Sequence, residues 1–166
     1  LNQHYLKEND PKRVAHLLSP HMGDLEIDPA LGPDLVEVAR AHQERAKTLV
    51  EMAGMSAYCY RDFEDIEATA AKKHLRPAAL EPLEKIRAAL AELQDWSPDA
   101  LHAQVQEVAD MLELNMGKVA QPLRVAVVGR AASPGIDITL FLVGREATLR
   151  RIDKAIEFVR QRAAQA

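Results

Sequence analysis

The chain has 166 residues, of which 48% are hydrophobic and 28% are charged, a balance typical of a folded domain that argues against wholesale disorder. With 21 Lys and Arg against 25 Asp and Glu, the net charge is −4, which argues against a protein that coats nucleic acid through bulk charge but still allows a local basic site. The single cysteine excludes an internal disulfide, and no run approaches the roughly 20 apolar residues of a membrane span.

The N-terminal part is predicted to be helical, because Ala and Leu are abundant and seven glycines are too few for a turn-rich β domain. Asp10-Pro11 predicts a helix start, with Asp as the cap and Pro in the first turn. Ser19-Pro20 predicts the end of this helix. Glycines and prolines then predict a loop over residues 21–33.

A long helix is predicted from about Asp34 to Ala53, since its apolar residues approximate a period of 3.6, and Gly54 predicts its end. Arg45 would lie in the middle of this helix, near the border of its apolar face. Two interpretations are open. Arg45 is a surface residue whose aliphatic stem packs on the core, or its planar guanidinium donates hydrogen bonds to a base edge or a phosphate.

Further helices are predicted over residues 65–75 and 77–93, and Ser97-Pro98-Asp99 predicts the start of a helix that fades near Asn115. Residues 123–129 and 138–144 are short apolar runs, which periodicity alone leaves open as strands or buried helices. From Glu146 the chain is helical again. The apolar stripe of this helix consists of Leu149, Ile152, Ile156 and Val159. The basic residues that lie off the stripe are Arg150, Arg151 and Lys154.

Charge is unevenly divided along the chain. Residues 118–166 hold nine Lys and Arg against four Asp and Glu, a local +5, whereas residues 1–117 hold 12 basic and 21 acidic residues, a local −9. We therefore expect an anionic partner at the C-terminal portion, unless the basic residues form an ordinary solvated helix face.

The sequence offers little for catalysis or metal binding. The six histidines lack the spacing of metal ligands, and Cys59 has no partner cysteine, so we predict no metal site, no catalytic residue and a buried, inert thiol. Residues 129–135 suggest a phosphate-binding loop, but the Lys and Ser or Thr of a P-loop do not follow its second glycine. A rigid polar turn is the better interpretation.

Several segments, in the right order over nearly the whole chain, resemble the C-terminal part of bacterial glutamyl-tRNA synthetases. The most specific segment is Gly117-Lys118-Val119-Ala120-Gln121-Pro122-Leu123-Arg124-Val125-Ala126, followed by Gly129-Arg130, Ser133-Pro134-Gly135-Ile136, Thr139-Leu140 and Gly144-Arg145-Glu146. Supporting similarity comes from Leu1-Asn2-Gln3-His4-Tyr5-Leu6 and Glu44-Arg45-Ala46-Lys47-Thr48-Leu49. The family's catalytic half has His-Ile-Gly-His-like and Lys-Met-Ser-Lys-like signatures, and neither occurs here.

The resemblance implies an all-α fold, the two consecutive helical subdomains of the class I glutamyl-tRNA synthetase anticodon-binding region, at residues 1–72 and 73–166. It also implies that residues 118–128 and 137–143 are helices, with Gly129 and Gly144 as helix stops. The chain lacks an initiator Met, and we expect it to be a fragment of a larger enzyme.

The resemblance assigns contacts with the anticodon to particular positions. Arg45 corresponds to the position that contacts the third anticodon base, and the other bases would be contacted by Arg124 and by the turn of Ser133, Pro134, Gly135 and Ile136. Phosphate contacts are expected from Lys47, Lys118 and Arg130. Asp137 stands where many members of the family have Phe, so the local packing there is expected to differ.

The function that follows is recognition of the anticodon of tRNA(Glu) by a cytoplasmic monomer that binds neither DNA nor a membrane. The fragment would need no cofactor, whereas the parent ligase would use ATP and Mg²⁺ in its catalytic domain. Two alternatives stay open, a helical protein-interaction module with a basic C-terminal surface and a small nucleotide-binding enzyme that uses the 129–135 loop.

Overall fold

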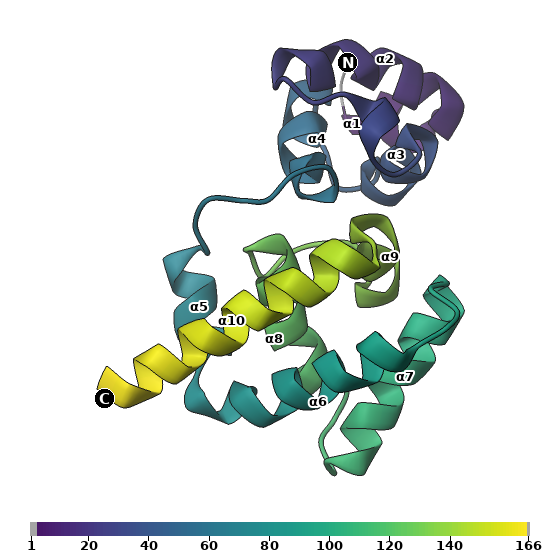
Figure 1. The fold of residues 1–166 in the computed structure, drawn as a ribbon. Coiled ribbons are helices and arrows are strands. Elements are labelled where there is room, and N and C mark those ends of the chain that lie inside the picture. The colour runs from purple at the N-terminus through teal and green to yellow at the C-terminus, as the bar shows by residue number, and fades with distance from the viewer. Residues whose placement is uncertain (1–2, 166) are drawn as a thin grey trace. The chain divides into compact units, whose positions relative to one another are not determined.

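A computed structural model describes residues 3–165, and the resemblance at Leu1 and Asn2 lies outside the described residues. Within residues 3–165 the chain forms ten α-helices and three short 3-10 helices and no strand (Figure 1), which confirms the predicted all-α class. The chain divides by packing into two compact units, Leu1–Asp62 and Phe63–Ala166.

The first unit packs around the second of its helices. Its elements are α1 (Gln3–Glu8), α2 (Pro11–Asp24), η1 (Pro29–Leu31), α3 (Leu35–His42), α4 (Leu49–Ser56) and η2 (Ala57–Cys59). The Asp10 side chain accepts a hydrogen bond from the Lys12 N–H, as the sequence predicts for a cap. The predicted end at Ser19-Pro20 is wrong, because α2 continues through Pro20 and buries Met22 completely. Burial of the last turn outweighs the backbone hydrogen bond that Pro20 cannot donate.

The long helix predicted from Asp34 to Ala53 is two helices, α3 and α4, separated by a turn. Thr48 is extended and caps α4 by accepting a hydrogen bond from the Glu51 N–H at 3.0 Å. Gln43 is buried, and its side-chain amide donates to the backbone oxygens of Leu6 and Asn9 at 3.1 and 2.9 Å. The apolar period continues across the break, so periodicity alone could not show it.

The second unit surrounds α8. Its elements are α5 (Ala68–His74), η3 (Pro77–Ala79), α6 (Leu80–Glu92), α7 (Pro98–Met111), α8 (Gly117–Val128), α9 (Ile136–Val143) and α10 (Arg145–Gln165). The two apolar runs that the sequence left open are α8 and α9, both helices, as the resemblance implies. Helix α8 packs against α5, α6, α7, α9 and α10 and is buried along most of its length.

Packing divides the chain earlier than the predicted boundary between residues 72 and 73. Helix α5 packs on α8, and the Glu67 N–H donates to the Gly129 carbonyl at 2.9 Å. Residues 63–72 therefore belong to the second unit.

The C-terminal end of α8 is closed by Gly129, Phe63 and Arg151. Gly129 has φ +83°, and a Cβ atom there would lie 2.8 Å from Cδ2 of Phe63. Arg151 is only 4% exposed, donates to the Val127 carbonyl at 2.7 Å and places its guanidinium 5.5 Å from the Phe63 ring centroid. The sequence places Arg151 off the apolar stripe of the last helix, but this contact with the end of α8 buries it.

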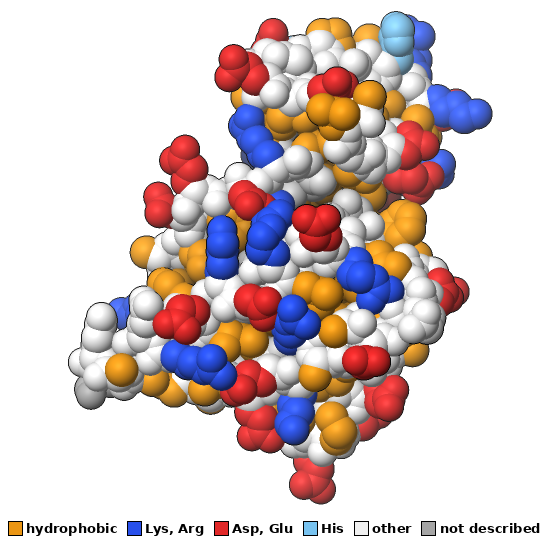
Figure 2. All heavy atoms as spheres, viewed as in Figure 1, with side chains coloured by type: hydrophobic (Ala, Val, Ile, Leu, Met, Phe, Trp, Pro, Cys, Tyr) orange, Lys and Arg blue, Asp and Glu red, His pale blue; other side chains and the backbone are white. Residues whose placement is uncertain are grey.

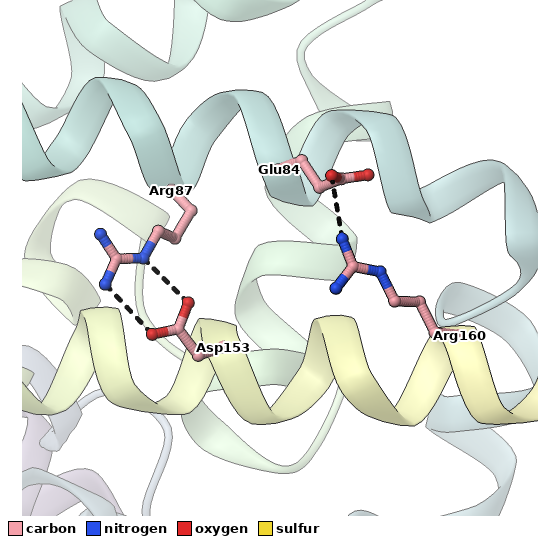
Figure 3. Close-up of polar contacts among 4 residues, drawn as sticks. All are labelled: Glu84, Arg87, Asp153 and Arg160. Carbon is pink, nitrogen blue, oxygen red and sulfur yellow. Dashed lines mark hydrogen bonds and ion pairs between the residues drawn. The ribbon is translucent and has the colours of Figure 1, made fainter.

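Helices α6 and α10 run antiparallel and are joined by two ion pairs (Figure 3). Arg87 donates to both carboxylate oxygens of Asp153 at 2.9 and 3.1 Å, and Arg160 approaches Glu84 at 3.2 Å. These side chains are partly exposed, so each pair contributes about 0.2–1 kcal/mol. The pair with Glu84 engages Arg160 of α10 within the fold.

Substituting Gly129 with Ala tests the closure of α8. Gly129→Ala is expected to lower the free energy of unfolding by at least about 1–2 kcal/mol, because an alanine there adopts a left-handed backbone conformation and meets Phe63. Gly54→Ala is the matched control, since Gly54 lies inside α4 with open space around it, and it is expected to stabilise the protein by about 0.5–1 kcal/mol. Urea unfolding followed by circular dichroism measures both changes, and a neutral Gly129→Ala would contradict this description of the α8 end.

Candidate nucleic-acid interface

The predicted site residues lie in both units. Arg45 and Lys47 are in the first unit, whereas Lys118, Arg124, Arg130 and residues 133–136 are in the second. The structure brings Arg124 together with the 133–136 turn, and it holds the Arg45–Lys47 segment in a separate turn of the first unit.

Arg45 lies in the turn between α3 and α4 rather than in mid-helix, and its side chain and that of Lys47 are exposed. The Arg45 N–H donates to the His42 carbonyl at 3.0 Å. His42 is buried, with Nδ1 2.7 Å from the Val38 carbonyl and Nε2 2.9 Å from the Tyr58 hydroxyl. Gln43 is also buried and hydrogen-bonded to α1. The buried side chains of His42 and Gln43 therefore hold the turn in place, while Arg45 and Lys47 face solvent.

Arg124 is braced against the turn that follows α8. Its Nε donates to Ser133 Oγ at 2.7 Å, and its Nη1 donates to Gln121 Oε1. Two contacts on one planar guanidinium fix its orientation, so the side chain is positioned before any ligand arrives. The sequence nominated both Arg124 and Ser133, but Gln121 was missed as a positioning residue.

The 133–136 turn is rigid because its polar groups bond to one another. Ser133 Oγ lies 2.8 Å from the Pro134 carbonyl and 3.0 Å from Thr139 Oγ1, and Thr139 Oγ1 donates to the same carbonyl at 3.0 Å. Ser133, Pro134 and Ile136 are buried, so Gly135 is the exposed member of the turn. A Cβ on Gly135 would lie 2.8 Å from the Asp137 carboxylate, which folds back over it.

This geometry does not fit a P-loop. Gly129 ends α8 against Phe63, Ser133 is bonded within the turn, and no strand precedes the loop in the part of the chain that the structure describes. A P-loop needs a strand before it and backbone N–H groups that face a phosphate. The 129–135 segment is a rigid polar turn.

The sequence missed a basic pocket in the second unit. Lys73 and His74 at the end of α5 and Arg76 just after it line a cavity of about 470 Å³ together with Lys118 and Gln121 of α8. Burial lowers the pKa of His74, and nearby Lys73, Arg76, Arg124 and Lys118 lower it further. The basic residues between Lys72 and Arg76 are the sequence signal that could have revealed this pocket.

Three of the nine basic residues of segment 118–166 are engaged within the second unit. Arg151 is buried, Arg160 pairs with Glu84, and Arg145 donates to the Leu90 carbonyl at 2.9 Å and lies 4.9 Å from the Trp96 ring centroid. On the face that Figure 2 shows, basic and acidic side chains are intermingled over the second unit. The cations that line the pocket come partly from residues 1–117, whose net charge is −9, and partly from Lys118.

We also searched the described residues for metal ligands and membrane-spanning helices. Between residues 3 and 165 no group of three or more His, Cys, Asp and Glu side chains is arranged to hold a metal ion, and Cys59 is buried. None of the helices in that range is both long and apolar enough to cross a membrane.

Comparison with known proteins agrees with this architecture. Residues 13–156 match the family described as anticodon binding domain. A glutamate–tRNA ligase of Elizabethkingia meningosepticum, solved with its amino acid, superposes with a TM-score of 0.86 at 23% identity over 95% of this chain and 31% of its own. A glutamate–tRNA synthetase of Elizabethkingia anophelis superposes with a TM-score of 0.81 at 25% identity over 94% of this chain and 30% of its own.

The chain thus spans about a third of the length of either ligase. The family match covers most of its residues and both units, and the superpositions extend over nearly all of it. The chain belongs to the anticodon-binding domain family, with the fold that this region has in glutamate–tRNA ligases.

Proposed function

We propose that this chain binds the anticodon of tRNA(Glu) on behalf of a glutamate–tRNA ligase. The observation that carries the proposal is Arg124, held against the 133–136 turn by Ser133 and Gln121 within a domain of the anticodon-binding family. Anticodon bases are unstacked in a loop, and proteins read such bases through fixed polar groups and planar side chains. The rigid 133–136 turn supplies the fixed polar groups, and the guanidinium of Arg124 supplies the planar side chain.

Arg45 supplies discrimination at the third anticodon base. The Watson–Crick edge of cytosine offers two adjacent acceptors, N3 and O2, to the two donors of a guanidinium. The same edge of guanine offers two adjacent donors, so a guanidinium would meet unpaired N–H groups there. The turn anchored by His42 and Gln43 keeps Arg45 exposed and lowers the entropy lost when it binds.

The remaining predicted contacts add affinity. Lys47, Lys118 and Arg130 are exposed cations, suited to backbone phosphates. Residues 133–136 contribute contacts to bases, chiefly through the exposed backbone at Gly135. The chain acts as a monomer with tRNA as its partner and without DNA, in the cytoplasm.

The chemical step belongs to the rest of the ligase. The parent enzyme activates glutamate with ATP and Mg²⁺ and transfers it to the tRNA, whereas this region contributes binding and specificity. A protein-interaction module with a basic C-terminal surface fits less well, because Arg145, Arg151 and Arg160 are engaged within the second unit.

Arg45→Gln, made in the full-length ligase, tests base discrimination. The variant is expected to reduce the preference for C over G at the third anticodon position about ten- to a hundredfold, since one bidentate contact is worth about 1–3 kcal/mol. The measurement is the ratio of kcat/KM for the two tRNAs. Arg40→Gln, an exposed arginine of α3 that pairs with Glu37, is the control and should leave this ratio unchanged. An unchanged ratio in Arg45→Gln would refute the assigned role.

Ser133→Ala tests the bracing of Arg124. It removes the acceptor of a charge-assisted hydrogen bond, which is worth about 1.5–3 kcal/mol, and releases the guanidinium. The affinity of this chain for tRNA(Glu), measured by fluorescence anisotropy, is therefore expected to fall several-fold, and Ser133→Thr should largely restore it. If a folded Ser133→Ala binds as tightly as the wild type, the hydrogen bond does not position Arg124 for binding.

The isolated chain is expected to be inactive in aminoacylation. Purified protein, mixed with ATP, Mg²⁺, glutamate and tRNA(Glu), should form no glutamyl-tRNA, while the full-length ligase serves as the positive control. Measurable product from the isolated chain would show that its residues carry chemistry that the proposal does not assign to them.

A further inference from the structure

Cationic side chains make up part of the lining of the pocket in the second unit. Lys73 and Arg76 reach it from the end of α5 and the segment after it, and Lys118 reaches it from the first turn of α8. His74 lies among them, and no Asp or Glu lines the cavity in the described structure. Like charges gathered without a counter-charge repel one another, so an anion that enters gains attraction from all of them.

Apolar side chains also line the pocket. They are Pro82 of α6, Leu114 before α8 and Pro122 of α8, and Leu114 is 37% exposed. A large apolar side chain at the surface is suited to cover the flat face of a planar ligand. The volume of about 470 Å³ falls within the usual range of small-ligand sites.

A connection runs from the pocket to the proposed anticodon contact. Gln121 lines the cavity, and its Oε1 accepts a hydrogen bond from the Arg124 guanidinium. Beyond Gly117, the residues of α8 that are not buried are Lys118, Gln121 and Arg124, spaced three apart. Lys118 and Gln121 line the pocket and Arg124 contacts Ser133, so these polar positions connect the pocket with the 133–136 turn.

We propose that this pocket binds one unstacked RNA nucleotide, with its phosphate at Lys73, Arg76 and Lys118 and its base against Leu114, Pro82 and Pro122. The source of that nucleotide rests on the proposed function, which places it in the tRNA next to a base read by Arg124. A bound phosphate offsets the positive field at His74, so occupancy raises the pKa of the imidazole from its lowered value.

Binding of a mononucleotide tests the pocket independently of tRNA. The His74 ring signals are followed by NMR as this chain is titrated with uridine 5′-monophosphate, with inorganic phosphate and with uridine. We expect the nucleotide to raise the pKa of His74 at a lower concentration than phosphate does, and uridine to leave that pKa unchanged. If nucleotide and phosphate shift the pKa of His74 equally, the role of Pro82, Leu114 and Pro122 in binding the base is overturned. If neither shifts that pKa, the site itself is overturned.

A pair of double variants places the nucleotide in the tRNA. Lys73→Ala/Lys118→Ala removes two cations of the pocket, whereas Lys72→Ala/Lys154→Ala removes two exposed lysines that do not line it. The pocket variant is expected to weaken tRNA(Glu) binding at least about tenfold relative to the control, and to reduce the slope of log K against log salt by about 0.7 for each lost contact. The mononucleotide should also stop shifting His74.

The outcomes separate this proposal from the proposed function. If the wild type binds tRNA(Glu) in an anticodon-dependent manner and both double variants bind alike, the pocket proposal is overturned and the proposed function stands. If tRNA binding does not depend on the anticodon but the mononucleotide still shifts His74 in the wild type and not in the pocket variant, the pocket is a nucleotide site and the proposed function fails.

Discussion

The second unit depends on how α8 ends. The left-handed conformation at Gly129 ends the helix, Phe63 occupies the space where a side chain at that position would lie, and Arg151 satisfies the Val127 carbonyl. Arg151 is a buried cation that is kept by a hydrogen bond and an aromatic face. Because this end is closed within the core, α8 has one fixed rotation, and Lys118, Gln121 and Arg124 face outward.

In the first unit, too, interior contacts set the conformation of an exposed segment, because buried polar side chains fix the turn between α3 and α4. His42 and Gln43 each bond to groups far along the chain, and the turn that they support carries Arg45 and Lys47. In both units, therefore, the cations assigned to RNA stand on segments whose conformation is set from the interior. Under the proposed function, such preorganisation would let a few side chains discriminate between bases without a large basic surface, in keeping with a net charge of −4.

Local patterns were enough to predict most of the fold. Asp10-Pro11 and Ser97-Pro98 start helices where the caps require it, and the resemblance resolved the apolar runs of α8 and α9. The break at residues 43–48 escaped because Thr48 and Gln43 act through bonds that periodicity does not contain. The buried Arg151 and the basic pocket escaped for a similar reason, since both depend on segments that meet only in the folded chain. The anticodon residues were reached only through the resemblance and stay a prediction.

Dependence of RNA binding on the anticodon tests the account most directly. Electrophoretic mobility shift or fluorescence anisotropy would compare binding of this chain to tRNA(Glu) and to the same tRNA with an altered anticodon, at one salt concentration. The account predicts tighter binding of the cognate tRNA, by about 1–3 kcal/mol for each base that is read. Equal affinity for the two tRNAs would contradict it, because phosphate contacts alone carry no sequence information.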